Sequence, residues 1–304
     1  MTHSVQKLLK DYEKVKGVKY AEKLKFTGVG DRDVYNITAP FSDEGVNVIA
    51  GRVENRNTEY SDVIFFKEQN NQWTPCKNYP NYALQDPFVT KIGGKLVFGG
   101  VKVTPHPDDH KKLTWKTVFY SGESLKKLKF LTEGPEGMKD IRLLEMQDGQ
   151  IAVFTRPQGV KGGRGKIGFT KINDLSELTS ASIEKAPLIQ PHFSEEEWGG
   201  ANELYLLENG DIGLLGHIAR FDEEGDRHYY PITCRYQIES NQLTDMKIIA
   251  ERKDFPKGAA KRPDLTDVLF SGGLLFLENG DAELYVGVGD AEAHKAIVPH
   301  PFNK

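Results

Sequence analysis

Acidic residues open several similar stretches of the sequence, and they are the side chains best suited to acid–base chemistry. In each stretch a polar residue precedes an apolar strand, a turn containing glycine and a second apolar strand. The acids that open these stretches are Asp86, Asp140, Glu203 and Asp267. Where a fold brings carboxylates together, like charges raise one another's pKa, which keeps a general acid protonated near neutral pH. We therefore treat these four residues as candidates for one site.

Turn glycines divide the chain into repeated units. Gly45, Gly94, Gly149, Gly210 and Gly280 recur at spacings of roughly 50 to 70 residues. Three of them follow Asp or Asn between β-rich runs, which indicates hairpins because the central residues of such turns need a positive φ. A period of this length leaves room for four short strands, which is typical of a propeller blade, and the chain fits five blades. The sequence predicts an all-β, five-bladed propeller over residues 31–304.

Individual elements are expected from hydrophobic spacing. Residues 4–25 are predicted to be helical, within an N-terminal helical extension over 1–30, because Val5, Leu8, Leu9 and Tyr12 have helical spacing and Ser4 suits an N-cap. The expected strands include Val46–Val53, Val63–Phe66, Leu96–Val103, Lys116–Tyr120, Ile151–Thr155 and Ile167–Lys171.

A propeller would bring polar residues of every unit to one funnel mouth, because the innermost strands line the central channel. Besides the four acids, the units place Asn36, Arg52, Glu54, Arg156, His217 and Asp290 there. Each has a structural alternative. The acids can cap turns at strand starts. Arg52 and Glu54, two residues apart on one strand face, can form a salt bridge.

The segment from Arg156 to Lys166 is the best anion-binding candidate. Its glycines allow backbone amides to approach an oxyanion, and Arg156, Arg164 and Lys166 supply positive charge for phosphate. The alternative is a solvated hairpin loop. His217 and His228 are candidates to contact phosphate or a sugar, or else are ordinary structural histidines.

Composition limits the class of partner. The net charge is −4, with basic and acidic residues spread evenly, which argues against a nucleic acid or an anionic membrane as the main partner. No apolar run reaches the length of a membrane span, and the N-terminus lacks the apolar core of a signal peptide. Cys76 and Cys234 form no disulfide framework or metal-binding spacing. We expect a cytoplasmic protein without a metal; the oligomeric state stays open.

Five ordered motifs resemble a bacterial family of five-bladed propellers of uncharacterised function, in the superfamily of the furanosidases and β-mannoside phosphorylases. They are residues 51–59, 85–87, 139–142, 200–203 and 284–291. In the mannoside phosphorylases the aspartate of a Glu-Asp-Pro-Arg motif is the proton donor, and this resemblance implies that role for Asp86. Gln85 and Phe88 stand where that motif has glutamate and arginine, so a sugar-contacting pair is absent beside the implied acid.

The resemblance implies a carbohydrate-active enzyme that cleaves the glycosidic bond of a short oligosaccharide. Cleavage needs a proton for the leaving oxygen, and a carboxylate or phosphate to complete the displacement. Asp86 is then the acid, and Asp140 and Glu203 are candidates for the second carboxylate or for sugar contacts, as is Asp267. Inorganic phosphate is the one co-substrate considered, and no other cofactor is expected. The alternatives are a sugar-binding propeller without catalysis and a protein–protein scaffold.

Overall fold

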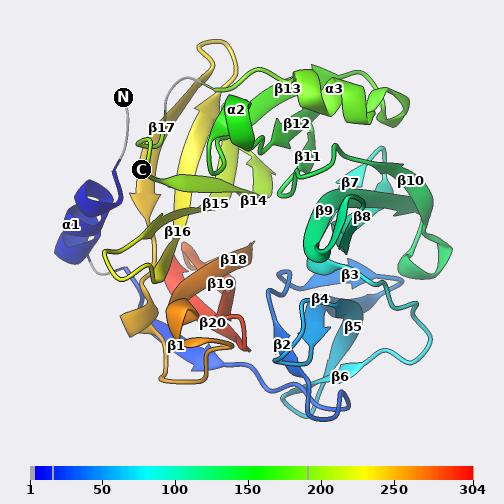
Figure 1. Cartoon of the computed structure of the whole chain (residues 1–304), viewed down its shortest axis with the longest axis vertical. Coiled ribbons are helices and arrows are strands. Elements are labelled where there is room, and N and C mark those ends of the chain that lie inside the picture. The colour runs from blue at the N-terminus through cyan, green and yellow to red at the C-terminus, as the bar shows by residue number, and fades with distance from the viewer. Residues whose placement is uncertain (1–3, 16, 190–191, 304) are drawn as a thin grey trace.

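The protein is described by a computed structural model, which covers residues 4–15, 17–189 and 192–303. Most of its regular structure is β, in agreement with the all-β prediction (Figure 1). The described helices are α1 (Val5–Val15), α2 (Gly159–Gly162) and α3 (Ser180–Lys185), with single 3-10 turns at Leu125–Lys127, Leu175–Glu177, Arg252–Asp254 and Pro263–Leu265. Among the described residues, no helix has the length and apolar character needed to cross a membrane.

The first three sheets follow the chain order. The first has the strand order β2-β4-β5-β6, with β3 paired to β4; its strands are β2 (Asp33–Tyr35), β3 (Phe41–Asp43), β4 (Val46–Glu54), β5 (Ser61–Gln69) and β6 (Gln72–Pro75). The second is a four-stranded meander of β7 (Gln85–Ile92), β8 (Lys95–His106), β9 (Asp109–Gly122) and β10 (Lys129–Glu133). The third contains β11 (Arg142–Glu145), β12 (Ile151–Thr155) and β13 (Gly168–Ile172).

The largest sheet joins two antiparallel sets of strands. One set is β14 (Trp198–Leu206), β15 (Ile212–Phe221), β16 (Arg227–Gln237) and β17 (Gln242–Ile248). The other is β18 (Asp267–Phe276), β19 (Asp281–Val288), β20 (Glu292–Pro299) and β1 (Tyr20–Lys23). A short parallel pairing, His228 with Asp267 and Tyr229 with Val268, connects β16 to β18.

Successive sets of strands are arranged around a common centre (Figure 1). Strand β7 contacts both β4 and β11, β14 contacts β11 and β18, and β19 and β20 return to contact β2. Aromatic side chains fill the spaces between neighbouring sheets. For example, the ring of Phe154 packs edge-on against Tyr236 of the next set of strands, with centroids 5.3 Å apart. The contacts between neighbouring sets of strands thus place all the sets around one central region.

The repeated glycine turns are confirmed. Gly45, Gly94, Gly149, Gly210 and Gly280 have φ angles between +74° and +86°, a region that glycine adopts without steric cost. Each lies in the hairpin between two successive strands, the first being the β3–β4 turn and the last the β18–β19 turn. The six predicted strands fall on β4, β5, β8, β9, β12 and β13, but β5, β8 and β9 are longer than predicted.

The helix expected over residues 4–25 is wrong beyond Val15. Helix α1 buries Val5, Leu8 and Tyr12, as their spacing predicts, and packs against β15 and β17. Residues Tyr20–Lys23 instead form β1, which pairs with β20 at the edge of the largest sheet. This pairing satisfies backbone groups that a short isolated helix would expose, so tertiary structure overrides local propensity. Residues 1–3, 16, 190–191 and 304 of the expected extension and domain lie outside the described residues.

Candidate active site

A polar cavity of about 370 Å³ lies where the strand sets meet. Its wall combines positive and negative side chains with aromatic ones. The cations are Arg52, Lys139, Arg156, Arg227 and Arg262; the acids are Glu59, Asp86 and Asp290; the rings include Trp115, His217, Tyr229 and Phe270. Such a wall suits a ligand that carries both hydroxyl groups and an anion.

Asp86 enters this wall from a β-bulge. The register of β7 against β8 shifts between Gln85 and Phe88, and Asp86 has a φ of +48°, a conformation uncommon for any residue except glycine. One carboxylate oxygen, Oδ1, accepts a hydrogen bond from Asn36 Nδ2 at 2.7 Å and another from Arg52 Nη1 at 3.2 Å. Asp86 is 4% exposed, so the fold holds a strained, buried carboxylate at the cavity.

Arg52 connects this acid to a second carboxylate behind the wall. Its guanidinium donates to Glu54 Oε2 at 2.7 Å and to Ser61 Oγ at 2.9 Å. Lys261 Nζ also contacts Glu54, at 2.5 Å. Burial alone would raise the pKa of Glu54, but the charge of Arg52 and these hydrogen bonds outweigh burial and lower it. Of the two roles considered for Arg52 and Glu54, the structure therefore contains the salt bridge.

Asp140 is the most deeply buried acid of the region. It has a φ of +58° and no exposed surface. Its oxygens lie 3.3 Å from Arg156 Nη1 and 3.9 Å from Arg142 Nη2, yet neither oxygen has a hydrogen-bond partner among the described residues. Burial alone would raise the pKa of Asp140, but the charges of Arg156 and Lys139 outweigh it and lower the pKa. Asp140 is therefore an ionised carboxylate directly behind the cavity wall.

Glycines create the space that Arg156 occupies. A Cβ atom at Gly165 would lie 2.6 Å from the Arg156 Nε, and one at Gly200 would lie 2.7 Å from its Cδ. The guanidinium is fixed by Nε, which donates to Gly199 O at 3.0 Å, and by the ion pair with Asp140. Nη1 has no hydrogen-bond partner among the described residues, although Arg156 is 2% exposed and lines the cavity. Nη1 lies 3.3 Å from Asp140, and without a hydrogen-bond partner it can still donate to an anion in the cavity.

His217 is neutral in this environment. Burial lowers its pKa to about 3, despite the opposing charge of Asp140. Its Nδ1 lies 2.9 Å from Asn202 Oδ1, and because an amide oxygen only accepts, Nδ1 carries the proton and Nε2 is left as an acceptor. The ring stacks on Tyr229 with centroids 5.4 Å apart. His217 can therefore accept a hydrogen bond from a ligand hydroxyl.

Asp290 is another acid of the cavity wall, in addition to Asp86 and Glu59. It follows β19 with a φ of +51°, in the turn that leads to β20. Burial raises its pKa, Arg52 opposes this rise, and the negative charge of Asp86 adds to it. The charge of Asp86 thus acts on Asp290, and the environment of Asp290 favours a bound proton.

Several predicted residues lie elsewhere. Glu203 accepts hydrogen bonds from the Tyr205 hydroxyl and from Leu274 N at 2.9 Å, and burial raises its pKa to about 7. Lys166 donates to the backbone carbonyls of Phe193, Ser194 and Glu197. Arg164 stacks over aromatic rings, 5.6 Å from that of Trp198 and 4.8 Å from that of Phe221. None of these three lines the cavity. Within the basic segment, only Arg156 reaches it.

His228 and Asp267 contact each other instead of the cavity. His228 Nδ1 lies 2.5 Å from Asp267 Oδ2, and its Nε2 lies 2.9 Å from Asp222 Oδ2. This contact reinforces the parallel pairing of β16 with β18. The two residues thus hold together the two halves of the largest sheet.

Some wall residues were absent from the sequence-based candidates. Lys139 directly precedes Asp140 in the motif over residues 139–142, and this position is the feature by which the sequence could have identified it. Arg227 and Arg262 lie outside the repeated units, at the start of β16 and before the Pro263–Leu265 turn, and Asp264 contacts both. No periodic pattern marks them. The described residues contain no cluster of three His, Cys, Asp or Glu side chains able to hold a metal ion.

The chain is similar to known proteins in sequence and in fold. Residues 10–304 match the model of a family described as "Protein of unknown function (DUF1861)", and the chain belongs to that family. A search of curated proteins found no match.

Solved structures give closer comparisons. A mannose phosphorylase from Leishmania mexicana, in complex with phosphate, is 34% identical with a TM-score of 0.90; the alignment covers 98% of this chain and 93% of that one. A GDP-Man-dependent mannosyltransferase from the same organism is 35% identical with a TM-score of 0.89, covering 98% and 95% of the two chains. A β-1,2-mannobiose phosphorylase from Listeria innocua, 13% identical with a TM-score of 0.63 over 93% and 91%, shares the fold. The expected similarity to mannoside phosphorylases is thus confirmed.

Proposed function

We propose that this protein is a carbohydrate-active enzyme of the phosphorylase type, which transfers a mannosyl group between a short mannoside and inorganic phosphate. One observation carries the proposal: the central cavity combines two interacting acids with two cations that can still donate hydrogen bonds. Lys139 has no hydrogen-bond or ion-pair partner in the described part of the chain, and Arg156 Nη1 has no hydrogen-bond partner there, although it lies 3.3 Å from Asp140. The similarity to a mannose phosphorylase bound to phosphate supports it.

The phosphate would bind at Arg156 and Lys139. Arg156 Nη1 lacks a hydrogen-bond partner, and Lys139 forms no hydrogen bond or ion pair with any residue in the described part of the chain. Both side chains line the cavity, and the charge of Lys139 acts on Asp140, as that of Arg156 does. Arginine offers planar paired donors and lysine a point charge, a combination suited to phosphate.

In the proposed reaction, a phosphate oxygen attacks the anomeric carbon of the mannosyl group and the glycosidic carbon–oxygen bond breaks. The leaving oxygen takes a proton, so the products are mannose 1-phosphate and the shortened sugar. The proton would come from the Asp86–Asp290 pair, with Asp86 as the donor that the resemblance implies. Burial and the negative charge of Asp86 raise the pKa of Asp290, so a proton held at Asp290 would be available in the cavity for the leaving group.

The fold that presents this site is, in our interpretation, a five-bladed β-propeller. The five antiparallel sets of strands and the contacts of each with the next support it. In this interpretation β1 is the outermost strand of the last blade, and the cavity lies at one mouth of the central channel.

The test is to incubate the protein with β-1,2- and β-1,4-mannobiose, with and without phosphate, and to measure mannose and mannose 1-phosphate. We expect phosphate-dependent release of mannose 1-phosphate. Asp86→Asn should abolish it, while the exposed control Asp11→Asn should not change it. Release of mannose without phosphate would replace phosphorolysis by hydrolysis. Transfer from GDP-mannose in the absence of phosphate would instead indicate a transferase.

A sugar-binding protein without catalysis is the second candidate, and one observation favours it. Arg52 contacts Asp86 and Arg156 contacts Asp140, so two of the predicted acids are neutralised by arginine. Measurable binding of a mannoside without turnover of any donor would decide for this candidate.

A further inference from the structure

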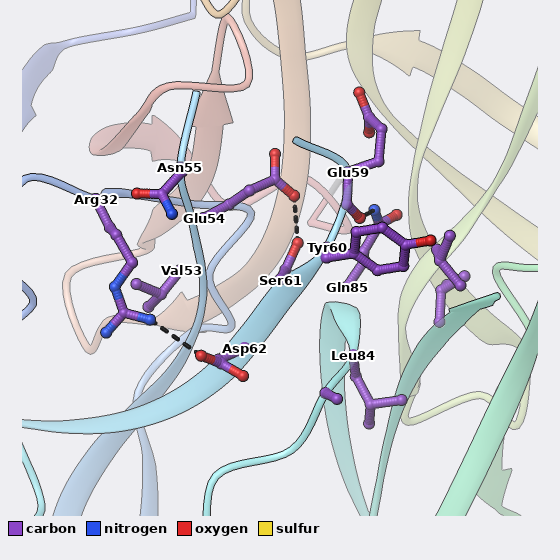
Figure 2. Close-up of a pocket in the computed structure, with 13 residues that line it drawn as sticks. Arg32, Val53, Glu54, Asn55, Glu59, Tyr60, Ser61, Asp62, Leu84 and Gln85 are labelled. Carbon is purple, nitrogen blue, oxygen red and sulfur yellow. Dashed lines mark hydrogen bonds and ion pairs between the residues drawn. The ribbon is translucent and has the colours of Figure 1, made fainter. Parts of the chain in front are cut away.

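A second pocket opens beside the central cavity, and we propose that it binds the sugar rings of a mannoside that extend beyond the cleaved linkage. This inference rests on the proposed function. The pocket has a volume of about 280 Å³ and lies between the first two sheets, where β4 ends and where β5 and β7 begin (Figure 2). Its ligand would be a neutral oligosaccharide of three or more sugars.

The pocket and the cavity share a wall. Glu59 lines both of them. The Arg52 guanidinium contacts Asp86 through Nη1 at 3.2 Å and Glu59 through Nη2 at 3.6 Å, so one planar group joins the proposed proton donor to the neighbouring pocket. Gln85, which lines the pocket, directly precedes Asp86 and donates from Nε2 to the carbonyl of Glu59 at 2.7 Å. In this proposal, the sugar ring that follows the one released at Asp86 lies against Glu59.

The lining suits a sugar ring. Tyr60 is 57% exposed, and an exposed aromatic face packs against the C–H groups of a pyranose. The side chains of Tyr60 and Asn55 form no hydrogen bond or ion pair with other described residues, so the phenol and the amide are available to hydroxyl groups. Leu84 and Val101, which are 3% and 2% exposed, form an apolar floor. An apolar floor with a few polar groups is typical of small-molecule sites.

Charge distinguishes this pocket from the cavity. Arg32 is the arginine that the described residues contribute to the pocket lining. It is held by Asp62 at 3.0 Å (Figure 2) and by the Val29 carbonyl at 3.1 Å. Glu54 is bound by Arg52 and Lys261, and Lys261 also contacts Glu59 at 2.9 Å. Among the described residues, the cation that lines the pocket is thus paired, whereas Lys139 at the proposed phosphate site is not. A neutral sugar fits it better than a phosphorylated one.

The experiment measures binding and turnover against chain length. Mannobiose, mannotriose and mannotetraose, each in a β-1,2- and a β-1,4-linked series, are titrated calorimetrically into the full-length protein. We expect the affinity to rise about tenfold from two sugars to three or four, which corresponds to one additional ring contact of roughly 1.4 kcal/mol. Tyr60→Ala and Asn55→Ala should each reduce this gain. Tyr20→Ala, a control with the same 57% exposure on β1, should preserve it.

Equal affinity for two, three and four sugars would overturn the inference, as would a gain that both pocket variants leave intact, or an absence of binding in both series. Turnover of mannobiose is measured in parallel, because it tests the proposed function separately. Turnover without a length-dependent gain refutes only the extended site. A gain that depends on Tyr60, without turnover, supports the extended site and refutes the phosphorylase.

Discussion

Replacing Arg156 by methionine should destabilise the protein by about 3–5 kcal/mol, the usual cost of leaving a buried charge without its partner. Asp140 has no exposed surface, and after the change its nearest remaining cation is Arg142 at 3.9 Å. The hydrogen bond from Arg156 to the Gly199 carbonyl at 3.0 Å is lost as well. Methionine fills much of the same space, so the effect reports on charge and hydrogen bonding more than on a cavity.

The assay is urea unfolding followed by tryptophan fluorescence, with two further variants. Arg56→Met removes an ion pair with Asp33 of good geometry, 2.8 Å for both contacts, but Arg56 is exposed. It should cost less than about 1 kcal/mol. The double variant Arg156→Met/Asp140→Asn removes the orphaned charge, so it should be more stable than Arg156→Met alone, with a coupling of about 1–3 kcal/mol.

The reasoning would be refuted by an Arg156→Met variant that loses no more stability than Arg56→Met. It would also be refuted if the effects of Arg156→Met and Asp140→Asn simply add. Either result would mean that Asp140 is not held as a buried anion by Arg156.

Three further predictions concern the cavity. Phosphate at about 100 times its Kd should raise the free energy of unfolding by about 2.7 kcal/mol. Lys139→Ala should remove most of this gain, and equal stabilisation of the unchanged protein and the variant would contradict the phosphate site. His217 binds a proton in the unfolded chain near pH 6.5 but in the folded protein only near pH 3, so its contribution to stability is lost as pH falls between these values. His217→Gln should therefore reduce the slope of the free energy of unfolding against pH by up to about 1.4 kcal/mol per pH unit over this range. The measurement is denaturant unfolding at a series of pH values, and an unchanged slope would contradict a buried neutral ring. Gly200→Ala places a Cβ 2.7 Å from Arg156 Cδ and 3.2 Å from Asp140 Cβ; it should cost about 1–3 kcal/mol in denaturant unfolding, and a neutral effect would show that Arg156 has room to move.

The sequence allowed much of the fold to be predicted, because local chemistry determines it. A turn that needs positive φ selects glycine, and strands buried along most of their length select Val, Ile and Phe, so both recur along the chain. Strand β1 could not be found this way. Its four residues, Tyr20–Lys23, are not apolar enough to mark a strand, and only pairing with β20 makes them one.

The structure brings several of the candidate residues together where they hold the same place in the repeat. Asp86, Arg52, Arg156 and His217 line the cavity, and Asp140 lies directly behind it. Other candidates lie apart from the cavity because their side chains have partners that the sequence pattern does not show. Lys166 has the charge and glycine neighbours of an anion-binding residue, but its ammonium group is occupied by three backbone carbonyls.

The pairing of β1 with β20 also constrains how the chain folds. Tyr20 pairs with Ile297 and Lys23 with His294, so contacts of very large sequence separation complete the last set of strands. During synthesis the edge of β20 does not exist until almost the whole chain has been made, and β1 must wait unpaired. Such non-local pairing closes late and slowly. The exposed backbone of β20 is then a template for the β1 segment of another copy, which makes exchange of this strand between molecules the expected misfolding route at high concentration.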